Sequence, residues 1–270
     1  MKAQGGRSHG VTPELNRDYS TRTANRQAAF VLPYLRPGMD LLDIGCGPGT
    51  ISLGLAKAVV PGRVSGVDHD AKHVQQANRS VAEQGVTNAT FLRGDVLILP
   101  FPDAQFDVVF ENNVFTHLAD RAEQAAREVY RVLKPGGLFA ARDVNVEAVL
   151  WGGLPDALQP LDKLFIRWHH SRGSDITIGR RLPALLREAG FGNTVKSVSA
   201  DTKGDSESTR AHADMTSSLL DGPFGQALLD NGWAPSATVE NMKKAIHRWG
   251  EDPDAFFANV HVEVIGWKPD

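Results

Sequence analysis

Short apolar runs alternate with amphipathic stretches along the first half of the chain. The run Leu41–Ile44 is too short for a helix and follows Pro37 and Gly38, so we interpret it as a buried strand. Similar runs predict strands at residues 63–70, 89–96, 106–110 and 138–143. Between them we expect helices at residues 50–59, 72–84 and 121–133, with another at 13–35 ahead of the first strand. Successive strand–helix units of this kind predict an α/β fold with a largely parallel sheet.

The pattern is weaker after residue 143. We expect a helix at 179–190, where Pro183 fits only in the first turn, and two more strands at 195–200 and 259–267, the last of them antiparallel. The expected architecture is therefore a Rossmann-like, seven-stranded, mostly parallel sheet with helical lid insertions. The predicted division is a cap helix region (1–36), a core (37–144), a lid insertion (145–178), more core (179–204), a helical insertion (205–250) and a final core strand (251–270).

A glycine-rich loop follows the first strand. Gly45, Gly47 and Gly49 stand at alternate positions before a predicted helix, so a ligand could approach bare backbone and the unpaired N–H groups of the helix start. The loop fits neither the dinucleotide pattern Gly-x-Gly-x-x-Gly nor a P-loop, since it has no lysine. Asp43, two residues before Gly45, would repel a pyrophosphate and suit a cationic amine or sulfonium.

Composition and net charge exclude several classes of function. The chain has 270 residues and a net charge of −3, with acids and bases interspersed, which gives no support for nucleic-acid binding. We expect a cytoplasmic protein without membrane insertion, because no apolar run approaches ~20 residues and the N-terminus lacks a signal-peptide core. Cys46 is the single cysteine, which excludes a multi-thiolate site, and no acidic cluster has metal spacing, so no metal is predicted.

The sequence Leu41-Leu-Asp-Ile-Gly-Cys-Gly-Pro-Gly49 resembles the first motif of class I S-adenosylmethionine (SAM) methyltransferases. The stretches Leu97–Asp103 and Arg131-Val-Leu-Lys-Pro-Gly-Gly-Leu138 resemble the group that methylates ubiquinone and menaquinone precursors. The resemblance implies a small-molecule methyltransferase that uses SAM and releases S-adenosylhomocysteine. After the fourth strand the chain lacks Asn-Pro-Pro-Tyr, the signature of enzymes that methylate amino groups of adenine or glutamine.

The resemblance also implies cofactor contacts. Asp68 ends the second strand about twenty residues beyond the glycine loop, where an acid accepts hydrogen bonds from both ribose hydroxyls. His69 could pack on the adenine or simply face solvent, and Tyr19 and Arg22 could meet the cofactor carboxylate or belong to a solvated helix face. The expected cofactor-binding residues are Tyr19, Arg22, Asp43, Gly45, Cys46, Gly47, Gly49, Asp68, His69, Gly94, Asp95, Val96, Asn112 and Asn113.

Methyl transfer to oxygen or carbon can need a general base, and histidine titrates near neutrality. His117, His169 and His170 are the candidates, and the sequence does not rank them. Three aromatic side chains could line the acceptor site or belong to the hydrophobic core: Phe115, Trp151 and Trp168. Two rival functions stay open: SAM binding with non-methylating chemistry, and a nicotinamide oxidoreductase, which Asp43 and the glycine spacing disfavour. A homodimer is also left open.

Overall fold

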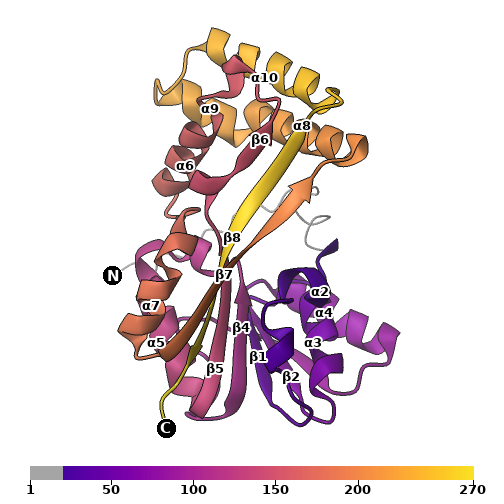
Figure 1. The fold of residues 1–270 in the computed structure, drawn as a ribbon, viewed down its shortest axis with the longest axis vertical. Coiled ribbons are helices and arrows are strands. Elements are labelled where there is room, and N and C mark those ends of the chain that lie inside the picture. The colour runs from indigo at the N-terminus through magenta and orange to yellow at the C-terminus, as the bar shows by residue number, and fades with distance from the viewer. Residues whose placement is uncertain (1–20) are drawn as a thin grey trace. The chain divides into compact units, whose positions relative to one another are not determined.

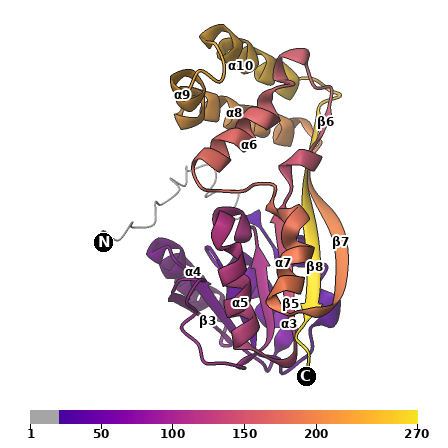
Figure 2. The ribbon, with the colours of Figure 1, turned by 90° about the vertical axis from the view of Figure 1, so that its left-hand side faces the viewer.

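The computed structural model describes residues 21–270, which form two compact units. Unit 1 ends at Gly94 and unit 2 begins at Asp95. Figures 1 and 2 show the elements of each unit in two views related by a quarter turn. The division made from the sequence stays a prediction. None of the described helices is long and apolar enough to cross a membrane.

Unit 1 is built from strand–helix repeats. Its three strands are parallel and hydrogen-bonded in the order β3-β2-β1, and they are covered by helices whose apolar faces give the amphipathic patterns in the sequence. Gly54 of α3 lies so close to α2 that an added Cβ would fall 2.6 Å from Ala24 Cβ. Its elements are α2 (Ala24–Gln27), a 3-10 turn (Leu32–Tyr34), β1 (Leu41–Ile44), α3 (Thr50–Val59), β2 (Val64–Asp68), α4 (Ala71–Gln84) and β3 (Ala89–Arg93).

The five described strands of unit 2 centre on the last one in the sequence. β4 and β5 are parallel, whereas β8 runs antiparallel to β5 on one side and to β7 on the other, and the short β6 pairs with its first residues. β6 comes from the region expected to be an insertion and adds a strand to the expected set. The strands are β4 (Phe106–Asn112), β5 (Leu133–Val144), β6 (Leu150–Gly152), β7 (Gly192–Lys203) and β8 (Phe256–Trp267).

Two groups of helices pack on this sheet. α5 and α7 cover one face (Figure 2), where Phe191 contacts both Phe139 of β5 and Tyr130 of α5. The other group gathers at the far end of β7 and β8 and has its own apolar core around Trp249 and Met242. The α-helices are α5 (Ala122–Val132), α6 (Leu161–Ser171), α7 (Leu182–Ala189), α8 (Ser206–Asp221), α9 (Pro223–Asp230) and α10 (Ser236–Gly250).

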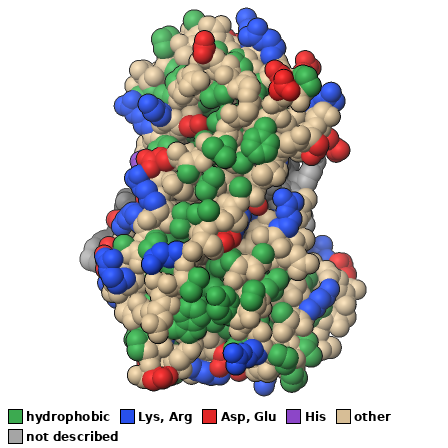
Figure 3. Space-filling model, viewed as in Figure 1, with side chains coloured by type: hydrophobic (Ala, Val, Ile, Leu, Met, Phe, Trp, Pro, Cys, Tyr) green, Lys and Arg blue, Asp and Glu red, His purple; other side chains and the backbone are tan. Residues whose placement is uncertain are grey.

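Short 3-10 turns connect these elements: Phe115–His117, Ala119–Arg121, Val146–Ala148, Asp156–Leu158 and Ile178–Arg181. Pro183 lies in the first turn of α7, as expected from its missing N–H. On the face drawn in Figure 3, acidic and basic side chains are interspersed, and no large area carries a single sign of charge.

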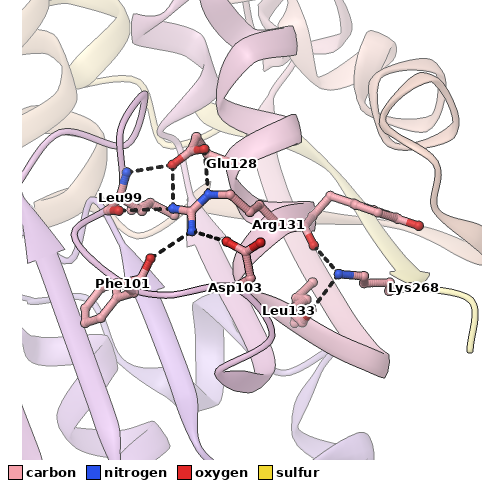
Figure 4. Close-up of polar contacts among 8 residues, drawn as sticks. Leu99, Phe101, Asp103, Glu128, Arg131, Leu133 and Lys268 are labelled. Carbon is pink, nitrogen blue, oxygen red and sulfur yellow. Dashed lines mark hydrogen bonds and ion pairs between the residues drawn. The ribbon is translucent and has the colours of Figure 1, made fainter.

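Arg131 fixes the loop that precedes β4 (Figure 4). Its guanidinium donates to both carboxylate oxygens of Glu128, to the carbonyls of Leu99 and Phe101, and to Asp103. These five bonds occupy all five N–H groups of the side chain. The loop that resembles the quinone-methyltransferase group is therefore held on α5 by one residue of the Arg131–Leu138 motif.

Candidate active site

The glycine loop of unit 1 has the backbone that its sequence predicts. Gly45, Gly47 and Gly49 have φ values of 65°, 52° and 82°, which favour glycine. A Cβ added to Gly49 would fall 2.9 Å from Ala77 Cβ, whereas one added to Gly47 would meet no atom within 4 Å. The loop thus packs tightly at its end and leaves open space beside Gly47.

Helix α3 begins directly after this loop without a side-chain cap. Its N-cap is Gly49, which has no side chain to accept a hydrogen bond from the first-turn N–H groups. A helix start of this kind carries a partial positive charge and attracts carboxylates and phosphates.

Asp68 connects the loop to the end of β2. Its Oδ2 accepts the N–H of Gly47 at 2.8 Å and its Oδ1 accepts that of Asp70 at 2.8 Å, while the residue is only 6% exposed. Burial alone would raise the pKa of Asp68, but hydrogen bonds from His73, Asp70 and Gly47 outweigh it and lower the pKa. The carboxylate is therefore ionised at neutral pH.

Two histidines accompany Asp68. His73 is mostly buried and lies 3.8 Å from Asp68 Oδ1, and this hydrogen-bonding partner raises its pKa. His69 is also near, at 3.4 Å, but its side chain is 80% exposed. His73 was not predicted from the sequence. Its position in the first turn of α4, shortly after Asp68, could have indicated that its side chain meets this acid.

Asp43 is not an open charge at the loop. It lies buried in β1 and accepts a hydrogen bond from Ser52 Oγ. Burial raises its pKa to about 7, against the lowering effect of Ser52 and with a further increase from Asp68. Near neutral pH it is only partly charged, which weakens the charge argument made from the sequence. Cys46 is buried too, and burial raises the pKa of its thiol.

The remaining residues that the sequence predicts at the cofactor come from both units. In unit 1, Gly94 donates its N–H to the carbonyl of Asp68 at 3.0 Å, and Arg22 is half-buried. In unit 2, Asp95 is exposed, its Oδ1 accepts the N–H of Leu97 at 2.9 Å, and Val96 lies in that turn. Tyr19 lies outside the described residues. The cofactor roles of all these residues stay predictions.

Asn112 is the last residue of β4 and Asn113 follows it, and both side chains are hydrogen-bonded to other groups of unit 2. Asn112 Oδ1 accepts from Arg142 Nη1 at 2.8 Å. Asn113, at φ 58°, accepts the N–H of Val144 at 3.0 Å and places its amide nitrogen 3.3 Å from His261 Nε2. Both asparagines therefore have fixed orientations.

Arg142 was not recognised from the sequence, although an arginine inside an apolar strand was a signal. Its side chain is 1% exposed, 3.2 Å from Asp201 and 3.6 Å from Glu263, and it also donates to Ser199 Oγ. The buried cation is thus compensated by acids of β7 and β8 while it orients Asn112.

The three candidate histidines differ in their surroundings. His117 is exposed on the turn after β4, and His169 packs against Phe165 and Trp168. His170 has its Nε2 3.3 Å from Asp175 Oδ1. His170 and Asp175 also line an open hollow of about 420 Å³ whose residues are Ala119, Asp120, Glu123, His170, Gly173, Ser174, Asp175 and Arg181.

The three aromatic side chains considered as acceptor walls pack among other rings. Phe115 is fully buried and makes an edge contact with Phe139 at 5.9 Å. Trp151 donates to Asp162 and contacts Trp249, and Trp168 lies against Phe224, both within the core of the helical insertion. Their contact with an acceptor stays a prediction. Within residues 21–270, no three His, Cys, Asp or Glu side chains are grouped to hold a metal ion.

Comparison with known proteins identifies the family. A family model described as a methyltransferase domain matches residues 41–137. The protein named "Probable methyltransferase ltbC" from Aspergillus luteorubrus is 31% identical over 280 aligned residues, which cover 96% of each chain. The chain belongs to the class I SAM-dependent methyltransferases. The family resemblance noted in the glycine loop is thereby confirmed.

Two further proteins are similar to this chain, one in sequence and one in fold. A demethylmenaquinone methyltransferase of Lactiplantibacillus plantarum is 38% identical over 149 residues, 54% of this chain and 58% of that protein. The solved structure of phosphoethanolamine N-methyltransferase 2 from Haemonchus contortus, in complex with phosphomonomethylethanolamine and S-adenosylhomocysteine, has a TM-score of 0.54. It is 18% identical and covers 91% of this chain and 53% of its own. The expected Rossmann-like fold is confirmed.

Proposed function

We propose that this methyltransferase binds SAM at the glycine loop and transfers its methyl group to an oxygen, nitrogen or carbon atom of a small-molecule acceptor, either of the quinone type or a specialised metabolite. The observation that carries the proposal is the Gly47–Asp68 bond, which joins a glycine loop to a buried, ionised carboxylate. A glycine turn at the protein surface does not require a buried carboxylate as its hydrogen-bond partner.

The residues of unit 1 fit the donor. A carboxylate offers about four lone-pair positions, and Asp68 uses some of them for Gly47, Asp70 and the more distant His73, so capacity remains for a ribose hydroxyl. The open space beside Gly47 admits a ligand at the backbone, and the positive end of the α3 dipole suits a carboxylate. Bound SAM supplies a methyl group that its sulfonium already activates, so the protein mainly aligns the acceptor and excludes water.

Unit 2 carries features that suit an acceptor. The hollow of about 420 Å³ lies in the size range of small-molecule sites. His170 faces it, and Asp175 holds the imidazole in one orientation, as a general base requires. We therefore favour His170 over His117 and His169 as the base for hydroxyl or carbon acceptors. The named activity of the Lactiplantibacillus relative supports quinols as the first acceptors to test.

The test is calorimetric titration with SAM and S-adenosylhomocysteine, followed by transfer of a labelled methyl group to a panel of quinols, phenols and amines. Binding with transfer is the expected result, and the labelled product identifies the acceptor class. Binding without transfer to any acceptor would favour a SAM-binding protein with other chemistry. Absence of binding would overturn the proposal.

A further inference from the structure

Two carboxylates lie fully buried where β4 and β5 end. Glu111 and Asp143 each have 0% exposure. Glu111 is paired with Ala141 across the two parallel strands, and Asp143 follows two residues later, so both side chains lie on the same face of the sheet. Neither residue belongs to the cofactor loop or to the histidine candidates.

Both carboxylates accept hydrogen bonds from the turn that follows β4. Glu111 Oε2 accepts the N–H of Val114 at 3.0 Å, and the two oxygens of Asp143 accept that of Thr116 at 3.3 Å each. The turn is thus held by two of its amides, those of residues 114 and 116, on two buried side chains.

The same turn connects to the hollow. The carbonyl of Thr116 accepts the N–H of Asp175 at 2.8 Å, and its Oγ1 donates to the carbonyl of Asp175 at 3.2 Å. Asp175 in turn contacts His170, and His117 is the residue after Thr116. The positions of two candidate bases therefore depend on the turn.

We propose that Glu111 and Asp143 are positioning residues that hold residues 113–118, together with His117 and, through Thr116 and Asp175, His170, in the arrangement used for methyl transfer. Neither carboxylate touches the reacting atoms in this role. The catalytic part rests on the proposed function, whereas the ordering of the turn can be measured without it.

Burial and charge favour the neutral forms of the pair. Burial raises the pKa of Asp143 to about 8 and raises that of Glu111 well above its usual range, and the charge of Asp143 further opposes ionisation of Glu111. Among the described residues, Glu111 Oε1 has no hydrogen-bond partner, so a charge on Glu111 would be poorly compensated there. The other charged or titratable groups nearby are Arg142 on β5, His117 on the turn, and Asp175 with His170 and Arg181 at the hollow.

Three variants separate the two carboxylates. Asp143→Asn keeps the size but directs an NH₂ group at amide donors, so it should release the turn. Glu111→Gln imitates the protonated form and should preserve it. Asp107→Asn removes a half-exposed acid at the opposite end of β4, where it pairs with Lys134, and serves as the matched control.

The primary measurement is hydrogen–deuterium exchange of residues 113–118 at pH 6.5. We expect Asp143→Asn to speed exchange at least about tenfold, whereas Glu111→Gln and Asp107→Asn stay within about twofold of the wild type.

Labelled-methyl transfer supplies the second measurement, with the panel acceptor that the wild type methylates best. Asp143→Asn should lower kcat about 10- to 100-fold, the cost of a misplaced group, while its affinity for S-adenosylhomocysteine stays within about twofold. Unchanged exchange and unchanged kcat in a folded Asp143→Asn would overturn the inference. If that variant does not fold, Glu111→Leu, which removes the acceptor of the Val114 amide, decides: unchanged exchange of residues 113–118 in that variant refutes the positioning role. Failure of the wild type to bind S-adenosylhomocysteine refutes the proposed function alone.

Discussion

The N–H of Gly47 and the Oδ2 of Asp68 lie 2.8 Å apart, although 21 residues separate them in the sequence. This bond ties the glycine loop to the end of β2 and leaves part of the carboxylate for another donor. Asp68→Ala should weaken SAM binding at least about tenfold, because hydrogen bonds to a charged acceptor contribute ~1.5–3 kcal/mol. Calorimetry measures the affinity. Asp40→Ala, which removes the acid directly before β1, is the control, and equal affinity of both variants would remove the ribose assignment.

Gly47 and Gly49 should respond differently to alanine. Gly49→Ala combines a φ of 82° with a Cβ 2.9 Å from Ala77 Cβ and should lower the free energy of unfolding by about 3 kcal/mol or more. Gly47→Ala meets no neighbour and should cost only the backbone strain, about 1–2 kcal/mol, yet its methyl group would occupy space proposed for SAM. Urea unfolding and SAM titration distinguish these effects. A Gly47→Ala variant with full affinity would contradict the proposed contact.

Asp43 should make stability depend on pH. Its pKa is about 7 in the folded chain against 3.8 when unperturbed, so the unfolded chain loses this proton first. The carboxyl therefore lowers stability as the pH rises from about 4 to 7, by at most roughly 4 kcal/mol. Asp43→Asn should be more stable than the wild type at pH 8 and nearly equal at pH 4. Urea midpoints at both pH values measure this, and a difference that does not change with pH would refute it.

Arg131→Lys should destabilise unit 2. Lysine keeps the charge but cannot replace five donors in a planar fork, so we expect a loss of about 1–2 kcal/mol, reduced by the partial exposure of the pair. Thermal unfolding measures the loss. The control is Arg127→Lys, an exposed position on the same helix. Equal effects of the two substitutions would show that the Arg131 contacts contribute nothing measurable.

His170→Gln should lower kcat for phenol or quinol acceptors by about 100-fold, the usual contribution of a general base, and affect amine acceptors less. Smaller effects are expected for His117→Gln and His169→Gln, because His170 lines the hollow and pairs there with Asp175. Labelled-methyl transfer with both acceptor classes measures the difference. A larger loss in His117→Gln would transfer the role to that residue.

The local parts of the fold could be predicted from the sequence. Apolar runs and helical periodicity are properties of neighbouring residues, and the glycine loop and Asp68 belong to one strand–helix–strand unit. Arg142, by contrast, donates hydrogen bonds to Ser199 and Asp201, which are 57 and 59 residues away in the sequence. Local sequence patterns do not predict partners at such a separation. At Asp43 the sequence shows an acid, but it does not show the burial that raises the pKa of this acid.

The arrangement around β8 has a consequence for how the chain is made. β8 pairs with β5 through His261–Trp267, with β6 through Phe256–Ala258, and with β7 along nearly its whole length. The central strand of unit 2 therefore leaves the ribosome after all of its partners. Until then β5, β6 and β7 each have an edge without its native neighbour, and such edges favour aggregation. Assembly of this sheet is thus a late event in the folding of unit 2, because it needs β8.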